Sequence, residues 1–262
     1  MTFKLFLEYE GTRYSGWQIQ PRIKTIQGIL METASKIFSS EKIRITGAGR
    51  TDAGVHALEQ IAHFQTDTKI RPEIIRMKFN DLLPHDINIL RIEKTDNKFH
   101  SRHDAHNRSY IYCIAKRRTA FGKNFVWWIK DTLDTQKMLS ASSIFIGLHD
   151  FISFADKNSD ESSTKVQIEN IEFFENGSFI LIRIIGSHFL HKMVRRMIGV
   201  LVEIGRGNLS PKNIDSFLNH YSVIPAKFTS PPSGLYLEKI VYSPADMRKP
   251  LNELIPALPF SN

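Results

Sequence analysis

The order of the hydrophobic patterns constrains the fold of this sequence most strongly, because the same series of elements occurs twice along the chain. In the first half, alternation and helical spacing predict strand 3–9, helix 26–38, strands 43–46 and 61–64, helix 72–83 and strand 87–92. The second half repeats this order with strand 109–115, helix 135–146, strands 166–174 and 179–185, helix 189–204 and strand 235–242, and adds a helix over 211–221. The order β-α-β-β-α-β is that of the ferredoxin-like fold, which includes RNA-binding domains. The sequence therefore predicts an α+β protein of two ferredoxin-like or RRM-like halves, whose mainly antiparallel sheets flank a central cleft.

The length of the chain suits two such halves. A domain commonly contains about 100–200 residues, and the chain has 262. We expect an N-terminal α/β domain over residues 1–104 and a C-terminal α/β domain over residues 105–244. Proline is concentrated after residue 224, so residues 245–262 are expected to form an extended tail.

Basic residues are concentrated in two stretches. Lys and Arg number 35 against 27 Asp and Glu, a formal net charge of +8. Residues 98–130 contain eight basic residues and one acidic residue, and residues 183–212 contain six and one, whereas residues 131–175 contain nine acidic and three basic residues. This separation favours a surface that follows phosphates, opposite an ordinary solvated surface. Composition alone is equally compatible with charged helices and loops that bind no nucleic acid.

Cysteine content and hydropathy exclude other classes. The single cysteine, Cys113, cannot form an internal disulfide or supply a zinc site with several thiolates. A reducing cytoplasm is therefore the expected location. The most apolar stretch, residues 178–194, includes Arg183, His188 and Lys192, so it falls short of a membrane-spanning helix. We expect no role at a membrane.

A glycine-rich segment is the best candidate for chemistry. Residues 47–57 read GAGRTDAGVHA, and the three glycines allow the backbone to approach a ligand closely. The segment lacks the Gly-Lys-Ser/Thr ending of a phosphate-binding loop and the long helix that follows a dinucleotide fingerprint. Arg50 and Asp52 lie two residues apart, so they point to the same side of an extended segment. A guanidinium keeps a neighbouring carboxylate ionised, as a nucleophile or base requires, although a structural ion pair explains the same spacing.

The residues of this segment resemble a known family. Residues 49–56, GRTDAGVH, are similar to the signature of the tRNA pseudouridine synthase A family. Six further segments resemble that family's motifs in the family's order: GTRYSGWQIQ at 11–20, FHSR at 99–102, RSYIY at 108–112, DFISF at 150–154, FLHKMVR at 189–195 and GLYL at 234–237. Because the matches extend through both halves, the resemblance is highly specific.

The resemblance implies a fold of two similar α/β domains and an activity. The expected enzyme is an isomerase that converts uridine to pseudouridine at positions 38, 39 and 40 of the tRNA anticodon stem-loop. The resemblance also implies that the enzyme is a homodimer and needs neither a cofactor nor a metal. A carboxylate nucleophile can hold an intermediate while the base turns, and the target base must leave its stack to be reached.

The resemblance also implies roles for individual residues. Asp52 is the expected nucleophile, and Tyr110 is expected to pack on the target base. Arg50 and Arg195 are expected to hold the aspartate and a nearby phosphate or base, and Leu235 to close the pocket. In the central cleft, Asp52 of the first half would meet Tyr110 and Arg195 of the second. The further side chains expected to bind RNA are Trp17, His100, Arg102, Arg108, Lys116, Arg117 and Arg118; Trp17 is expected to support either the 11–20 loop or a flipped base.

Two features depart from the family pattern. His103 stands where phenylalanine is frequent, and Glu169 stands where the corresponding strand often begins with arginine. The acidic loop 156–161 precedes that strand. The acidic loop and Glu169 argue against the RNA contact that this loop usually makes in the family.

Histidine spacing suggests a metal site at first sight. His100, His103 and His106 recur at every third residue. Zinc requires ligands that converge tetrahedrally, and in an extended stretch this spacing does not make the rings converge. We therefore expect no metal site.

Two other functions fit parts of the sequence. A non-catalytic RNA-binding protein of two RRM-like units would carry an aromatic run on a central strand, but residues 61–65, IAHFQ, contain one aromatic residue. A metal-dependent nuclease would carry clustered carboxylates, whereas the next acidic residue after Asp52 is Glu59. The sequence therefore favours the synthase.

Overall fold

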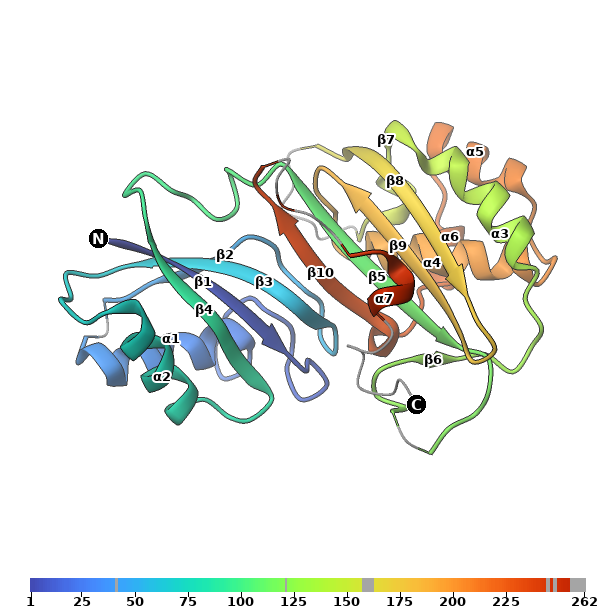
Figure 1. Cartoon of the computed structure of the whole chain (residues 1–262). Helices are drawn as coiled ribbons and strands as arrows, with labels where there is room; N and C mark the ends of the chain where they lie inside the picture. The colour runs from blue at the N-terminus through green and yellow to red at the C-terminus, as the bar shows by residue number, and fades with distance from the viewer. Residues whose placement is uncertain (41, 121, 157–162, 244–245, 247–248, 255–262) are drawn as a thin grey trace. The chain divides into compact units, whose positions relative to one another are not determined.

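The computed structural model describes all residues except 41, 121, 157–162, 244–245, 247–248 and 255–262 (Figure 1). The chain divides into unit 1, residues 1–106 and 236–246, and unit 2, residues 107–235 and 247–262. This division differs from the expected domains at the last strand, because residues 236–246 belong to unit 1 although the sequence assigns them, up to residue 244, to the C-terminal domain. Most of the expected tail lies outside the described residues, and its described part includes a short helix, α7 (Leu251–Leu254).

Unit 1 is built on a sheet in the order β4-β1-β3. Its elements are β1 (Thr2–Tyr9), α1 (Ile26–Phe38), β2 (Ile45–Gly47), β3 (His56–Gln65), α2 (Pro72–Leu82), β4 (Ile87–Thr95) and, from the far end of the chain, β10 (Leu235–Val241) without its first residue. Strand β1 pairs antiparallel with β3 and β4, β2 pairs antiparallel with β3, and β10 pairs parallel with β3. The first six elements follow the order β-α-β-β-α-β.

Both helices of unit 1 pack on the same face of the sheet. Phe3 and Phe64 are cross-strand partners whose rings stack with centroids 5.2 Å apart. Phe38 of α1 and Phe79 of α2 lie 5.6 and 6.3 Å from the ring of Phe64. Helix α1 begins after Thr25, whose hydroxyl accepts a hydrogen bond from the Gly28 amide. This packing fixes β3, the strand that follows the glycine-rich loop.

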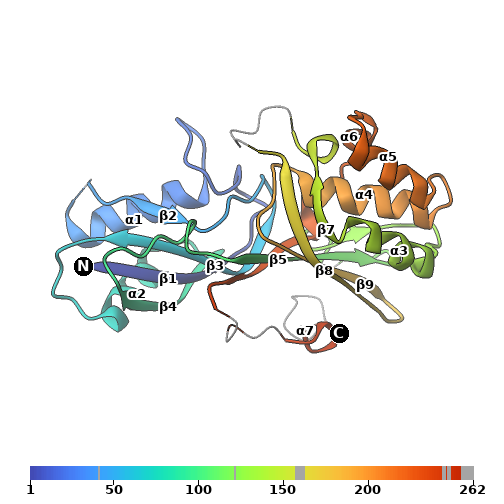
Figure 2. The same cartoon turned by 90° about the horizontal axis from the view of Figure 1, so that it is seen from above.

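Unit 2 is built on a sheet in the order β5-β9-β8-β7. Its strands are β5 (Asn107–Ala115), β6 (Trp127–Trp128), β7 (Gly147–Asp150), β8 (Lys165–Glu175) and β9 (Phe179–Gly186). Its helices are α3 (Thr135–Ser142), α4 (Met193–Gly205), α5 (Pro211–Asn219), α6 (Ile224–Lys227) and α7, with the 3-10 helices η1 (Ser143–Phe145), η2 (Ile152–Phe154) and η3 (Pro232–Gly234). Figures 1 and 2 show α7 on the face of the sheet opposite to α4.

The predicted α+β class and the predicted predominance of antiparallel strand pairs are confirmed. The protein is α+β, and the strand pairs within each unit are antiparallel except β3 with β10 and β5 with β6. Asn176 and Gly177 lie in the turn that joins β8 to β9, and the Asn176 side chain accepts hydrogen bonds from the amides of Ser178 and Phe179. In the described part of the chain, no helix combines the length and apolarity needed to cross a membrane.

Candidate active site

The loop between β2 and β3, residues 48–55, carries Arg50 and Asp52. Arg50 is exposed and Asp52 is half-buried. The loop leaves β2 with the Gln60 side-chain amide donating to the Gly49 carbonyl at 2.9 Å. It closes with the Val55 amide donating to the Asp52 carbonyl at 3.1 Å. The backbone around Asp52 therefore has a defined conformation.

A second segment, residues 11–17, holds this loop on both sides of Asp52. The Trp17 amide donates to the Thr51 carbonyl at 3.0 Å, and the Gly54 amide donates to the Tyr14 carbonyl at 3.3 Å. Gly16 has a φ of +87°, and a Cβ there would lie 2.5 Å from the Thr51 carbonyl oxygen. Because only glycine tolerates that φ and that contact, the two segments can lie this close.

The indole of Trp17 packs against Gly47, the residue just before the loop. Its side chain is buried, and a Cβ on Gly47 would lie 2.5 Å from the indole ring. The ring of Tyr9 lies 6.2 Å away. Of the two roles expected for Trp17, this burial agrees with support of a loop and argues against stacking on a base.

Tyr9 and His56 also hold the loop, although neither is among the residues predicted from the sequence. The Tyr9 hydroxyl shares a 2.8 Å hydrogen bond with the Thr51 hydroxyl, and burial raises the pKa of Tyr9, so it stays protonated. The Gly11 amide donates to Nδ1 of His56 at 3.0 Å. The sequence signal for His56 is its place as the last residue of the 49–56 motif, and that for Tyr9 is its position two residues before the 11–20 motif.

The residues expected beside Asp52 and Arg50 at the target base, Tyr110, Arg195 and Leu235, lie in unit 2. Tyr110 is in β5, and its ring meets Phe189 edge to face with centroids 5.1 Å apart. Arg195 is in the first turn of α4, where its Nε donates to the Ser230 carbonyl at 2.8 Å. The Ser230 amide donates back to the Arg195 carbonyl at 3.1 Å. Leu235, the first residue of β10, is buried.

Tyr112 fixes the segment that leads to Leu235. Its hydroxyl donates to the Pro231 carbonyl at 2.8 Å, and its ring packs edge to face on Trp127. A Cβ on Gly234 would lie 2.8 Å from this ring. Burial raises the pKa of Tyr112, which keeps the hydroxyl a hydrogen-bond donor.

Comparison with known proteins identifies the family. A family model described as tRNA pseudouridine synthase matches residues 5–104 and 141–243. The chain belongs to the tRNA pseudouridine synthase family. This is a family of isomerases, and Arg50, Asp52, Arg195 and Leu235 lie within the matched residues.

Curated relatives cover nearly the whole chain. Proteins named tRNA pseudouridine synthase A from Thermodesulfovibrio yellowstonii and Ehrlichia chaffeensis are 37% and 38% identical over 258 and 245 residues, which cover 92% of this chain and 100% of each relative. A third, from Thermoanaerobacter sp. (strain X514), is 36% identical over 240 residues, 91% of this chain and 98% of the relative. The motifs that suggest the pseudouridine synthase family therefore belong to a similarity over the full length.

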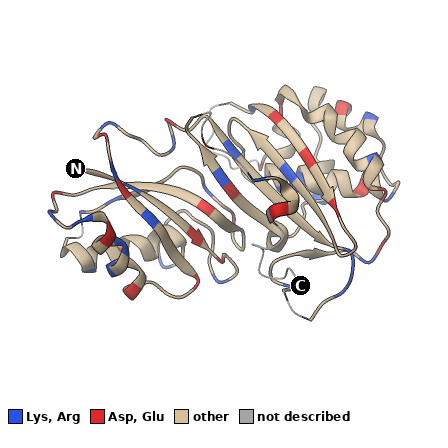
Figure 3. Cartoon of the chain, viewed as in Figure 1, with Lys and Arg blue, Asp and Glu red and all other residues tan. Residues whose placement is uncertain are grey.

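In this pseudouridine synthase family member, the basic residues after β5 differ in their surroundings. Lys116 pairs with Glu175 at 2.7 Å. Arg117 is exposed, and the Arg118 guanidinium lies 5.8 Å from the ring centroid of the exposed Trp128. Figure 3 shows the basic stretch that follows β5. Lys116 is thus paired with a carboxylate, whereas Arg117 and Arg118 are exposed.

Arg108 and Arg102 are less accessible. Arg108 is buried, and its Nη1 donates to the Ser187 carbonyl at 2.7 Å. Arg102 is half-buried. Burial of Arg108 against a backbone carbonyl argues for a structural contribution to the β5–β9 pair.

Residues 100–103 are not extended, so that part of the expectation is wrong, and the rings of His100 and His103 lie next to each other. Residues 101–103 form turns, and the Asp104 amide donates to the His100 carbonyl at 3.1 Å, which brings residues three apart to one side. The His100 ring lies 4.1 Å from that of His103 and 4.9 Å from that of His63. Burial lowers the pKa of both His63 and His100. In the described part of the chain, no group of three or more His, Cys, Asp or Glu side chains is arranged to hold a metal ion.

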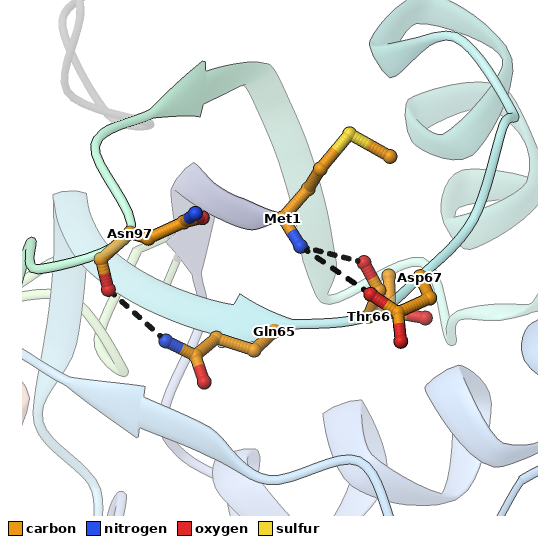
Figure 4. A pocket seen from close by; sticks show the side chains of 5 residues that line it. All are labelled: Met1, Gln65, Thr66, Asp67 and Asn97. Carbon is orange, nitrogen blue, oxygen red and sulfur yellow. Dashed lines mark hydrogen bonds and ion pairs between the residues drawn. The ribbon is translucent and has the colours of Figure 1, made fainter.

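A hollow at the start of β1 is unrelated to these residues (Figure 4). It is lined by Met1, Gln65, Thr66, Asp67 and Asn97. The N-terminal amine donates to the Thr66 carbonyl at 3.2 Å, and the Gln65 amide to the Asn97 carbonyl at 3.2 Å. None of the predicted site residues lines it, so we do not consider it a candidate active site.

Proposed function

We propose that this protein converts uridine to pseudouridine at positions 38, 39 and 40 of the tRNA anticodon stem-loop, with Asp52 as the nucleophile and without a cofactor. The observation that carries the proposal is that Asp52 is half-buried on a loop held by hydrogen bonds on both sides of it. The names of the relatives support tRNA as the substrate and pseudouridine as the product.

The reaction suits a single carboxylate. The bond between C1′ and N1 of uridine breaks, the uracil turns, and a bond forms between C1′ and C5. The hydrogen on C5 is lost and N1 gains one, so the product has the composition of the substrate and no oxidant or water is consumed. Asp52 would hold the intermediate covalently between the two bond changes.

The other site residues are proposed to bind and orient the nucleotide. Tyr110, whose ring is held edge to face by Phe189, is proposed to stack on the uracil once it leaves the RNA stack. Arg50 and Arg195 are proposed to hold Asp52 and a phosphate or the base, and Leu235 to close the apolar side of the pocket. Support comes from the motifs in which they lie and from the contacts that fix the backbone of Arg195.

The proposal is tested by incubating the purified protein with unmodified tRNA transcripts and mapping the pseudouridines. We expect modification at positions 38–40 when uridine is present there. Binding of the transcripts without any pseudouridine would instead support the non-catalytic RNA-binding alternative. Pseudouridine at other positions would keep the reaction and overturn the anticodon assignment.

We propose that the remaining predicted RNA-binding residues, His100, Arg102 and the basic stretch 116–118, contact the tRNA backbone. Replacing Arg117 and Arg118 by glutamine is expected to reduce the slope of log affinity against log salt by about 0.7–0.9 for each lost phosphate contact. Lys116→Gln is expected to change the slope less, because Glu175 already pairs with Lys116. Titrations of tRNA at several salt concentrations measure these slopes. Equal slopes for the wild type and the Arg117→Gln/Arg118→Gln variant would contradict the assignment.

We propose that the protein is a cytoplasmic homodimer. Leu148 of β7, the edge strand of the unit 2 sheet, is exposed, as are Ile146 just before this strand and Ile152 just after it, and exposed apolar patches mark association sites. Light scattering is expected to give twice the mass of the chain, and Leu148→Glu is expected to shift the population towards the monomer. A wild type that stays monomeric at micromolar concentration would refute this. The cytoplasmic location is proposed because tRNA is the substrate, in keeping with a free, buried Cys113.

A further inference from the structure

Asp86 is a buried carboxylate with two side-chain partners. It lies just before β4, and its side chain is 2% exposed. The Tyr14 hydroxyl donates to Oδ1 at 2.5 Å, and Arg13 Nε donates to Oδ2 at 3.0 Å. Buried carboxylates are unfavourable unless paired and hydrogen-bonded, and bonds of this charged kind are short and strong. Each carboxylate oxygen of Asp86 therefore accepts a hydrogen bond, one from Arg13 and the other from Tyr14.

The two partners of Asp86 lie in the segment that holds the Asp52 loop. The Tyr14 carbonyl accepts the hydrogen bond from the Gly54 amide, and three residues later Trp17 donates to the Thr51 carbonyl. Two backbone contacts, one on each side of Asp52, thus depend on the path of residues 13–17. The ring of Tyr14 is itself covered by the Lys24 ammonium at 4.7 Å.

We propose that Asp86 is a positioning residue for the Asp52 loop, acting through Tyr14 and Arg13. This inference rests on the proposed function, since it concerns the nucleophile named there. Asp86 orders residues 13–17, which in turn fix the carbonyl of Thr51 and the amide of Gly54. Positioning of this kind affects the chemical step more than tRNA binding, because a displacement of about 1 Å at a reacting group can lower a rate by about 100-fold.

Tyr14→Phe tests the proposal with the smallest change. It removes the hydroxyl that reaches Asp86 and keeps the ring beneath Lys24. We expect the single-turnover rate at saturating tRNA to fall about 10- to 100-fold, with the affinity for tRNA within about twofold of the wild type. Hydrogen exchange at the amides of residues 51–55 is expected to become faster. Asp86→Asn is expected to act in the same direction, and the double variant to be little slower than the slower single variant, because both changes act on the same contact between Tyr14 and Asp86.

A matched control separates positioning from general stability. Asn80 of α2 makes two hydrogen bonds with the backbone of Ile89, at 3.0 and 2.8 Å, within the same unit. Asn80→Ala is expected to lower the denaturant midpoint at least as much as Tyr14→Phe and to leave the single-turnover rate unchanged. The proposal is overturned if Tyr14→Phe reacts at the wild-type rate, or if Asn80→Ala loses as much rate.

The proposed function and this inference can fail separately. A wild type that forms no pseudouridine, with exchange at residues 51–55 still accelerated by Tyr14→Phe, would reject the function and retain the control of the loop by Asp86. An active wild type whose loop exchange and rate are both insensitive to Tyr14→Phe would reject the inference and retain the function.

Discussion

Asp52→Asn is expected to abolish pseudouridine formation, with a loss of rate on the order of 10⁴-fold or more, and to leave tRNA affinity nearly unchanged. Asparagine has the size of aspartate but lacks the second carboxylate oxygen that is proposed to attack. The loop is held by the backbones of Thr51, Gly54 and Val55, whose hydrogen bonds the substitution keeps. Release of tritium from C5 of labelled uridine in tRNA measures the reaction under single-turnover conditions, and filter binding measures affinity.

Asp67→Asn is the matched control for loss of a carboxylate in the same unit. Its side chain is fully exposed and pairs with the N-terminal amine at 3.7 Å. We expect the wild-type rate from this variant. Reaction of Asp52→Asn within about tenfold of the wild type would show that another group is the nucleophile.

Gly11→Ala is expected to have the second largest effect on the reaction rate, because the added methyl group would overlap with backbone atoms. Its Cβ would lie 1.9 Å from the carbonyl oxygen of Val55 and 2.6 Å from the carbonyl carbon. Both are backbone atoms at the end of the Asp52 loop, so the loop must move. We expect unfolding free energy to fall by about 1–3 kcal/mol and the single-turnover rate to fall by about 100-fold.

Gly177→Ala provides the comparison for this second substitution. Gly177 lies in the turn between β8 and β9, and a Cβ there would meet no atom within 4 Å. Urea unfolding and single-turnover rates are expected to match the wild type. If Gly11→Ala were as stable and active as Gly177→Ala, the close approach of residues 11 and 55 would not matter for the reaction.

Elements with local signals are predictable from this sequence. Apolar residues at helical spacing predict 26–38 and 72–83, and the helices observed are Ile26–Phe38 and Pro72–Leu82. Thr25 and Pro72 mark their beginnings. The predicted strand 61–64, by contrast, is the end of a longer strand, His56–Gln65. Its first residues follow a glycine loop, and pairing with β1 extends the strand.

Short edge elements are not predictable in the same way. Strand β7 has four residues, with Leu148 64% exposed, so it shows no alternation of buried and exposed side chains. Strand β6 has two residues and exists because β5 offers a partner. In both cases the pairing depends on the strand that precedes or follows in the chain and not on a pattern within the short segment itself.

The residues of the candidate site also differ in whether a local sequence signal predicts them. Arg50 and Asp52 are found from the sequence because their spacing and their motif are local. Tyr14 and Asp86 are 72 residues apart, and they meet because β1 and β4 pair, with Tyr9 opposite Ile87. Their contact depends on the register of a strand pair, which the spacing of residues in the sequence does not give. The buried carboxylate of Asp86 is therefore found only from the structure.

Strand β10 imposes an order on folding while the ribosome synthesises the chain. Residues 1–106 can form the β4-β1-β3 sheet early, but Tyr236 and Leu237 pair with His56 and Ala57 of β3. Until those residues have left the exit tunnel, the start of β3 lacks this partner, and unpaired strand edges are prone to association with other chains. The nascent protein therefore carries an incomplete unit 1 while all of residues 107–235 are made. His56, which accepts the bond from Gly11, also gains the stacked ring of Tyr236 only at that late stage.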